Sequence, residues 1–268
     1  RDRLRSRGLG DVYKRQCPSC GSPHIGGFKA GTQQIERVLE KEFPEARVLR
    51  MDFDTTRTKD SYEKILASFA GHEADILVGT QMIVKGHDFP DVTLVGVIAA
   101  DLSLNMDDYH CGERTFQLLT QAVGRSGRGD RPGHAVIQTY QPEHYSIQAA
   151  AIQDYEKFYK EEMGYRMLLD YPPAAHMMTV FGACQDEEFL KKAMYYIEVF
   201  IRRVSPKEEL HMIGPASASV GKVKDVYRQV LHLKHTDIRF LTAVREKLEK
   251  YIEINSGFRK IYIQFDMN

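Results

Sequence analysis

The sequence lacks any apolar run that approaches the ~18 residues a membrane-spanning helix requires. It shows no secretory signal, and it lacks an excess of charge of either sign. Its 268 residues hold 37 lysines and arginines against 37 aspartates and glutamates. Because no global basic charge indicates a nucleic-acid-binding protein, any contact with DNA must come from the local placement of a few groups.

Cysteine is scarce, with four residues in the chain, and only Cys17 and Cys20 lie close together. A C-x-x-C pair is typical of a reducing compartment and of metal chemistry rather than of a disulfide framework. The two thiolates can reach one tetrahedral zinc ion, but two ligands do not complete a structural site. We therefore interpret the pair as two ligands of a zinc site whose other ligands lie upstream, with a site completed within this chain as the alternative.

The first sixteen residues differ from the rest of the chain. They hold six basic and two acidic residues, no initiating methionine and no apolar periodicity, and the remainder carries 31 basic against 35 acidic residues. We interpret residues 1–16 as an artefactual or foreign leader and exclude them from the fold. The chain is then expected to be a fragment that begins in mid-domain at Cys17.

The middle of the chain alternates predicted helices with short apolar strands. One helix is expected after Thr32, a suitable N-cap residue, and it closes before Pro44. A second carries apolar residues around Ile65, and a third covers about 111–124. Strands are predicted at 48–51, 76–78, 93–100 and 134–140. This alternation predicts an α/β fold with a parallel sheet, whose ligand chemistry lies at the carboxyl ends of the strands.

A glycine-bearing stretch over residues 79–90 follows one of these strands. Thr80, Gln81 and the nearby backbone amides can donate to phosphate oxygens, contacts that carry no base information. Asp88 can accept a hydrogen bond from a ribose hydroxyl, or it can simply form a turn. Lys85 can bind a phosphate or remain a solvated charge.

The strongest signal is QLLTQAVGRSGRG at residues 117–129. A helical apolar pattern ends at glycines, which presents Arg125 and Arg128 at a helix end. Each guanidinium is permanently charged and matches phosphate oxygens in shape, so the pair suits a polyphosphate whose charge grows during hydrolysis. A solvated basic turn is the alternative, but the spacing from Gln121 to Arg128 and the stretch at 79–90 favour the nucleotide role.

The C-terminal half begins with a helical stretch predicted over about 143–163 and is then punctuated by Pro172-Pro173. Strands follow at 176–184, 210–213, 226–235 and 260–265, with helices at 187–204 and 237–254. This order is βαββαβ, the ferredoxin-like plan.

Two stretches, GTQMIVKGHDFPDVTLV at 79–95 and ERTFQLLTQAVGRSGR at 113–128, resemble the second helicase lobe of the primosomal protein N′ family of replication-restart helicases. The resemblance continues more weakly to the C-terminus. It implies an α/β fold, a RecA-like parallel-sheet helicase lobe followed by a smaller α+β, ferredoxin-like domain. The implied organisation is a leader (1–16), a partial zinc-binding segment (17–27), the second lobe (28–142), a helical linker (143–175) and the C-terminal domain (176–268).

The resemblance implies an ATP-dependent superfamily-two DNA helicase that moves 3′ to 5′ and restarts stalled forks through primosome assembly. The implied catalytic residues are Arg125, Arg128 and Gln121. The implied ATP-binding residues are Gly86, Asp88, Gly124, Arg125 and Arg128, and the DNA-binding residues are Thr32, Gln33, Gly79, Thr80, Gln81 and Lys85. The implied cofactors are ATP with Mg²⁺ in the full protein and Zn²⁺ at Cys17 and Cys20. The family's first lobe is absent, so the chain alone is not expected to hydrolyse ATP.

In the C-terminal half, residues 214–228 resemble the family's turn and basic, aromatic strand. We hypothesise that Lys222, Lys224 and Arg228 contact DNA phosphates or the acidic tail of single-stranded-DNA-binding protein, with a solvated edge as the alternative. Gln229 and Ala174 replace expected aromatic residues, which weakens the case for base stacking there. The implied partners are forked and single-stranded DNA, single-stranded-DNA-binding protein and other primosome proteins, without a membrane, in the bacterial cytoplasm at the nucleoid.

Two other interpretations of the function are alternatives to the helicase. The first is a non-catalytic module that binds nucleic acid or a partner on a helicase-like fold. The intact pair Arg125 and Arg128, with the glycines that expose it, argues against a pure scaffold. The second is a different superfamily-two translocase, which the Cys17 and Cys20 pair directly before the lobe disfavours.

Overall fold

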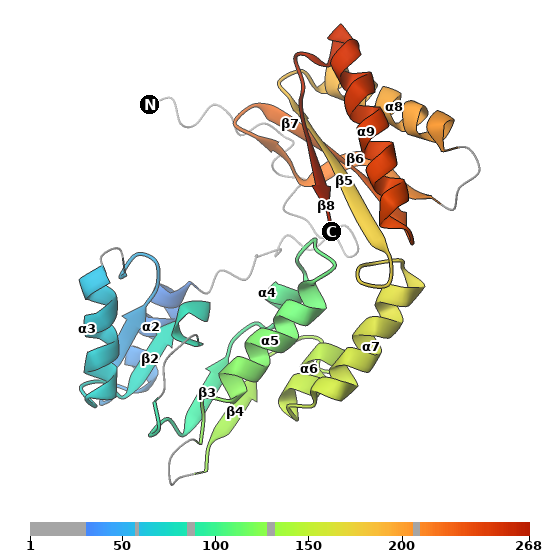
Figure 1. The fold of residues 1–268 in the computed structure, drawn as a ribbon. Coiled ribbons are helices and arrows are strands. Elements are labelled where there is room, and N and C mark those ends of the chain that lie inside the picture. The colour runs from blue at the N-terminus through green and yellow to red at the C-terminus, as the bar shows by residue number, and fades with distance from the viewer. Residues whose placement is uncertain (1–30, 57–58, 85–88, 128–131, 206–209) are drawn as a thin grey trace, which may run out of the picture. The chain divides into compact units, whose positions relative to one another are not determined.

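The computed structural model describes residues 31–56, 59–84, 89–127, 132–205 and 210–268 (Figure 1). The chain divides into two compact units, residues 1–90 and 91–268. None of the helices within the described ranges is long and apolar enough to cross a membrane.

The first unit is built on two parallel strands, β1 (Val48–Met51) and β2 (Ile76–Gly79), which pair in register over their full length. The helix α2 (Thr32–Glu42) precedes β1, and α3 (Lys59–Ala70) connects the two strands. A short 3₁₀ helix, η2 (Gln81–Val84), begins directly after β2. The parallel pairing predicted from the alternation of elements is confirmed here.

The beginning of α2 differs from the prediction. Gly31, not Thr32, occupies the N-cap position, and it makes no side-chain capping hydrogen bond. Thr32 is the first helical residue, and its hydroxyl donates to the carboxylate of Asp52. The hydroxyl is therefore used to tie α2 to the end of β1 rather than to cap its own helix.

The second unit begins with another parallel pair, β3 (Leu94–Val97) and β4 (His134–Ile137). A short helix that the sequence did not predict, α4 (Asp101–Leu104), and the longer α5 (Cys111–Val123) connect them. The buried face of α5 contributes Phe116, Leu119 and Ala122. Phe116 and Leu119 belong to a core cluster that also includes residues of α4 and of the following helices.

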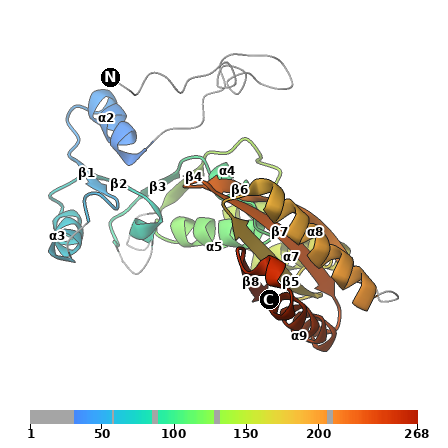
Figure 2. The same ribbon diagram turned by 90° about the horizontal axis from the view of Figure 1, so that it is seen from above.

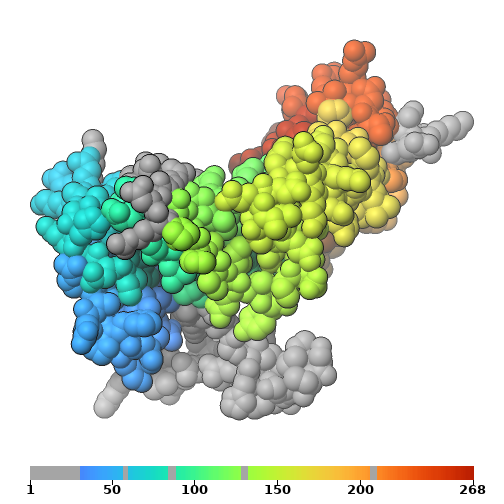
Figure 3. All heavy atoms as spheres, turned by 90° about the horizontal axis from the view of Figure 1, so that it is seen from below, coloured from blue at the N-terminus to red at the C-terminus, as the bar shows by residue number. Residues whose placement is uncertain are grey.

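The single helix predicted over 143–163 is wrong. The structure has two helices, α6 (Tyr145–Ala151) and α7 (Tyr155–Leu168). Between them Gln153 adopts a φ of 55°, which no helix continues through, and the Asp154 carboxylate accepts from the amide of Lys157 and caps α7. The side chains of α6 and α7, in yellow-green, form a continuous outer surface in the space-filling view (Figure 3).

The C-terminal part of the second unit is a four-stranded antiparallel sheet with the order β6-β7-β5-β8 (Figure 2). Along the chain the elements follow the predicted βαββαβ plan, and the strand order is the one that a ferredoxin-like fold requires. Their bounds are β5 (His176–Cys184), α8 (Glu187–Val204), β6 (His211–Val223), β7 (Val226–His235), α9 (Ile238–Ile254) and β8 (Tyr262–Met267), with a 3₁₀ turn, η3 (Ser256–Phe258), before β8.

Both long helices of this domain pack on the same face of the sheet. The shared core contains apolar side chains of α8 and α9 together with alternate residues of the central strands, including Val180 of β5 and Leu231 of β7. Ile263 and Phe265 of β8 pack against the same cluster. Since side chains alternate between the two faces of a sheet, the residues between these positions lie on the face opposite the helices.

The strand β6 is longer than predicted. Residues 214–219, expected to connect two strands, lie within β6, which loses register with β7 between Ile213 and Ala216 and again between Ser217 and Lys222. A two-residue turn at Lys224 and Asp225, with φ values of 48° and 62°, then joins β6 to β7. Two positive φ angles in succession are the geometry of a tight hairpin turn.

Gly79 gives a test of the packing in the first unit. A Cβ at this position would lie 2.4 Å from the carbonyl oxygen of Met51 and 2.7 Å from Cγ2 of Ile83. We expect Gly79→Ala to lower the free energy of unfolding by about 1–3 kcal/mol, the cost of overpacking, in urea titrations. Gly96→Ala on β3, where a Cβ meets nothing within 4 Å, is the control and should cause no such loss. Equal stability of the two variants would contradict the close approach.

Candidate functional site

The arginine turn follows the end of α5. Gly124 is the C-cap residue, and its amide donates to the carbonyl of Thr120. Arg125 comes next and is half-buried, while Gln121 is exposed one turn earlier on the helix. Gly86, Asp88 and Arg128, predicted to complete the ATP-binding set, lie outside the described residues. The structure thus places Gln121, Gly124 and Arg125 together at one end of α5.

The conformation of this turn is fixed by the approach of two backbone segments. Gly127 has a φ of +73°, a region that favours glycine, and its amide donates to the carbonyl of Val92, just before β3. A Cβ on Gly127 would lie 2.6 Å from the amide nitrogen of Gly133, and one on Gly133 would lie 2.1 Å from that of Gly127. The glycines therefore dock the turn against the segment that enters β4.

A second group of predicted residues lies at the carboxyl edge of the β1–β2 pair. Asp52, directly after β1, accepts from the hydroxyl of Thr32 and from the amide of Thr55. The hydrogen bond from Thr32 lowers the pKa of Asp52, against an opposing effect of burial. Because the Thr32 hydroxyl is already donated, the donors left for an anion at the start of α2 are the backbone amides of its first turn, beside the exposed Gln33.

The end of β2 lies at the same edge. Met51 pairs with Gly79 in the parallel register, so both strands terminate together. Thr80 and Gln81 follow Gly79 directly; the carbonyl of Thr80 accepts from the amide of Ile83, and the side chain of Gln81 is exposed. The predicted contacts Thr32, Gly79, Thr80 and Gln81 are therefore gathered at one edge, whereas Lys85 lies outside the described residues.

The three cations predicted to act together in the C-terminal domain do not share one surface. Lys222 pairs with Asp225 at 3.0 Å and lies 4.6 Å from the ring centroid of Tyr227. Lys222 and Tyr227 are also opposite each other in the β6–β7 register. Arg228 is the next residue along β7, so its side chain points to the other face, and Lys224 occupies the turn.

The predicted zinc ligands, Cys17 and Cys20, lie outside the described residues. Within the ranges that are described, no group of three or more histidine, cysteine or acidic side chains could hold a metal ion. Cys184 is buried beneath the sheet, and Cys111 begins α5, where burial raises the pKa of its thiol. A zinc site therefore remains a prediction that concerns residues 17–27.

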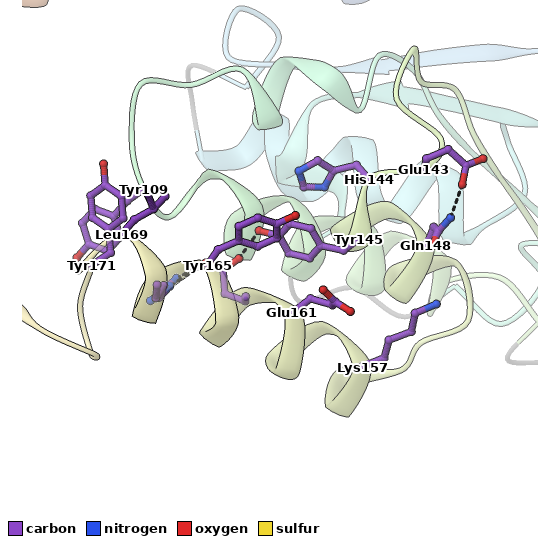
Figure 4. Close-up of a pocket in the computed structure, with 12 residues that line it drawn as sticks. Tyr109, Glu143, His144, Tyr145, Gln148, Lys157, Glu161, Tyr165, Leu169 and Tyr171 are labelled. Carbon is purple, nitrogen blue, oxygen red and sulfur yellow. Dashed lines mark hydrogen bonds and ion pairs between the residues drawn. The ribbon is translucent and has the colours of Figure 1, made fainter.

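The sequence did not indicate a pocket of about 610 Å³ formed mainly by α6, α7 and the segments beside them (Figure 4). Its wall contains a buried ion network. The guanidinium of Arg166 donates to Glu162 at 2.8 Å, to Glu113 of α5 at 2.7 Å and to the carbonyl of Pro172 at 2.9 Å. The Tyr145 hydroxyl donates to Glu162 at 2.6 Å, and burial together with this bond raises the pKa of Tyr145.

Aromatic rings continue this network toward the C-terminal sheet. Tyr109 stacks on Tyr171 with centroids 5.1 Å apart, and the Arg166 guanidinium lies 5.5 Å from the Tyr109 ring. On β7, Lys234 is 4% exposed, its ammonium lies 3.3 Å from the Tyr171 centroid, and it donates to the carbonyl of Leu169. The helix that ends at the arginine turn is thus joined through α7 to the C-terminal domain.

Two protein-family models match separate parts of the chain. Residues 27–130 match the family described as helicase conserved C-terminal domain, and residues 167–268 match the one described as primosomal protein N C-terminal domain. The arginine turn lies within the part of the chain that matches the helicase domain. The relatives are replication restart proteins named PriA: the protein of Bacillus subtilis strain 168 is 42% identical over 253 residues, and that of Thermotoga maritima is 37% identical over 238.

The chain therefore carries the two domains that these family models describe, and it is similar over nearly all of its length to PriA replication restart proteins. The Bacillus subtilis alignment covers 94% of this chain and 31% of that relative, and the Synechocystis protein is 41% identical over 84% of this chain and 27% of its own length. The chain thus spans about a third of the length of the curated relatives it matches.

Removal of Arg166 tests the ion network. Arg166→Met leaves the carboxylate of Glu162, 6% exposed, without its cationic partner, and we expect a loss of about 3–5 kcal/mol in the free energy of unfolding. The double variant Glu162→Gln/Arg166→Met should recover part of that loss because no charge is then buried. Arg202→Met, which breaks an exposed pair with Glu198, should cost at most about 1 kcal/mol. Equal effects of the two arginine variants would contradict the network.

His144 makes the stability of this region depend on pH. Its Nδ1 accepts from the amide of Ser146, and burial lowers the pKa of His144 from its ordinary value of 6.5. As pH falls through 6.5 the unfolded chain takes up a proton and the folded chain does not, so stability falls, by at most ~1.4 kcal/mol per pH unit. His144→Asn keeps a capping oxygen, and its unfolding free energy should change less between pH 7.5 and 5.5. An unchanged slope would reject this origin.

Proposed function

We propose that this chain supplies the second lobe and the C-terminal domain of an ATP-dependent, superfamily-two DNA helicase that moves 3′ to 5′ and restarts stalled replication forks. The observation that carries the proposal is the placement of Arg125. It is half-buried at the end of α5, in a turn whose backbone is docked against β4 through Gly127 and Gly133. Because this close approach fixes the backbone of the turn, the turn can present a guanidinium at a fixed position. A phosphate contact requires such a fixed position.

ATP with Mg²⁺, bound on a lobe that lies outside this chain, would supply the energy for movement. The residues of this chain would complete the site from the opposite side. Arg125 and Arg128 would bind β- and γ-phosphate oxygens, whose negative charge they stabilise as it grows. Gln121, exposed on the same helix end, would orient the attacking water. Gly124 would allow the backbone to approach the phosphates, and Gly86 and Asp88 would contact the ribose.

The carboxyl edge of the β1–β2 pair would contact the DNA backbone. The first-turn amides of α2 at Thr32 and Gln33, the side chains of Thr80 and Gln81 beside Gly79, and Lys85 are suitable donors to phosphate oxygens. Such contacts do not read sequence, which suits a motor that must act wherever a fork has stalled. They would place DNA at one site of the chain and nucleotide at another.

Other residues of the chain would make further contacts with DNA, with a metal ion and with partner proteins. Lys222, Lys224 and Arg228 would bind DNA phosphates or the acidic tail of single-stranded-DNA-binding protein, from opposite faces of the β6–β7 hairpin. Cys17 and Cys20 would provide two thiolates to a Zn²⁺ site that upstream residues complete. Other primosome proteins would be further partners, and the setting would be the bacterial nucleoid.

The arginine turn is tested in the full-length helicase that joins this chain to the first lobe. Arg125→Ala and Arg128→Ala should each lower DNA-stimulated ATP hydrolysis by at least ~10³-fold while DNA binding is retained, because only the charge opposite the phosphates is lost. Arg202→Ala on α8, an exposed arginine paired with Glu198, is the control and should hydrolyse ATP at the wild-type rate. Wild-type rates for both turn variants would rule out the motor proposal.

A further inference from the structure

The C-terminal sheet has a face that its own helices leave uncovered. We call the side opposite α8 and α9 the open face (Figure 1). At the end of this face where β5 terminates, Ala183 pairs with Arg228 on one side and with Tyr262 on the other. One row further along, Phe181 lies between Val230 and Gln264. The register therefore brings two aromatic rings, an arginine and an amide together on three adjacent strands.

The two rings are accessible and partly fixed. Tyr262 is 61% exposed, and Phe181 is half-buried beside it, with ring centroids 6.4 Å apart and planes inclined by 72°. The Tyr262 hydroxyl donates to the side-chain oxygen of Gln264 at 3.1 Å, which leaves the amide NH₂ group of Gln264 available. A large aromatic surface left toward solvent by the domain's own packing favours a ligand that has flat faces of its own.

Cations surround the same end of the open face. Arg228 belongs to it, Lys224 lies in the hairpin turn, and Arg259 and Lys260 precede Tyr262 in the chain. Among the described residues, no carboxylate lies within ion-pair distance of these four. Their charge is therefore available to an anionic ligand.

The carboxylates that follow β5 and the one in the hairpin turn are already engaged. Asp186 caps α8 by accepting from the amide of Phe189, Glu187 and Glu188 both pair with Lys191, and Asp225 pairs with Lys222. They satisfy local partners on the helix side or at the turn and do not neutralise the open face.

The opposite end of the open face has a different character. Asp266 lies one row beyond Gln264, opposite Thr179 on β5. Further along, Met177 and Lys234 are buried. The ligand surface is thus limited to the end of the sheet around Phe181, Tyr262 and Arg228.

We propose that this end of the open face binds single-stranded DNA, with unpaired bases stacked on Phe181 and Tyr262 and the phosphates directed along Arg228 and the cations beside it. The proposal rests on the proposed function for its choice of polymer and adds a base-contacting site to it. Stacking on aromatic rings accepts every base and requires bases that are not paired, which excludes duplex DNA from the rings. The NH₂ group of Gln264 would donate to acceptors at a base edge.

Base stacking at this site does not require the aromatic residues that the sequence lacks at two expected positions. Gln229 and Ala174 replace aromatic residues that the resemblance led us to expect. The structure supplies rings to the sheet from other strands, since Phe181 is on β5 and Tyr262 is on β8. Stacking therefore does not depend on an aromatic residue in β7.

The test measures binding of the 268-residue chain to fluorescein-labelled oligo(dT) by anisotropy at several salt concentrations. Tyr262→Ala and Phe181→Ala should each weaken binding roughly 5- to 100-fold with an unchanged salt dependence, because a stacked base but no phosphate contact is lost. Arg228→Ala should weaken binding and reduce the slope of log K against log salt by about 0.7. Tyr262→Phe keeps the ring and should retain binding, which separates stacking from a folding defect.

Tyr195→Ala is the matched control, since Tyr195 is 57% exposed on α8, on the helix side of the sheet. It should bind oligo(dT) like the wild type. Wild-type affinity of Tyr262→Ala and Phe181→Ala, with an effect of Arg228→Ala alone, would overturn the stacking site and leave a purely electrostatic surface. Displacement of oligo(dT) by duplex DNA at equal affinity, or binding of an acidic peptide in its place, would also overturn it. These outcomes leave the proposed function standing if Arg128→Ala still abolishes ATP hydrolysis in the full-length protein.

Discussion

The buried guanidinium of Arg166 is the interaction on which the second unit depends. Each of its nitrogens has an acceptor, on Glu162 of its own helix, on Glu113 of α5 and on the carbonyl of Pro172. Burial of charge is costly unless every donor is satisfied, so the three segments must keep their relative positions for the network to exist. The helix α5, which ends just before Arg125, is thereby held to α7, the helix that leads into the C-terminal sheet.

Much of the fold was predictable because its signals are local. The bounds of β5, α8 and β7 agree with the ranges 176–184, 187–204 and 226–235 predicted from the sequence. The break between α6 and α7 was missed because a positive φ at Gln153 leaves no pattern in the sequence. The length of β6 was missed because Gly214-Pro215 usually indicates a turn, whereas here it lies within a strand that changes register.

In the candidate sites, too, features with a local sequence signal could be predicted and long-range contacts could not. That Gln121, Gly124 and Arg125 lie together at one end of α5 could be predicted from their closeness in the sequence. The pairing of Arg166 with Glu113 could not, because 53 residues separate them, and only the i, i+4 spacing of Glu162 and Arg166 gave a hint. Sequence proximity was misleading for Lys222 and Arg228, which the alternation of a strand directs to opposite faces.

The contact between Gly127 and Gly133 has a consequence for how this segment can change over evolution. Each residue occupies the space that a side chain on the other would need, so replacing either one forces the two backbones apart. No second substitution at the partner can compensate, because glycine is already the smallest residue. The separation between the end of α5 and the beginning of β4 is therefore a fixed dimension, and variation should accumulate in the residues between the two glycines rather than at them.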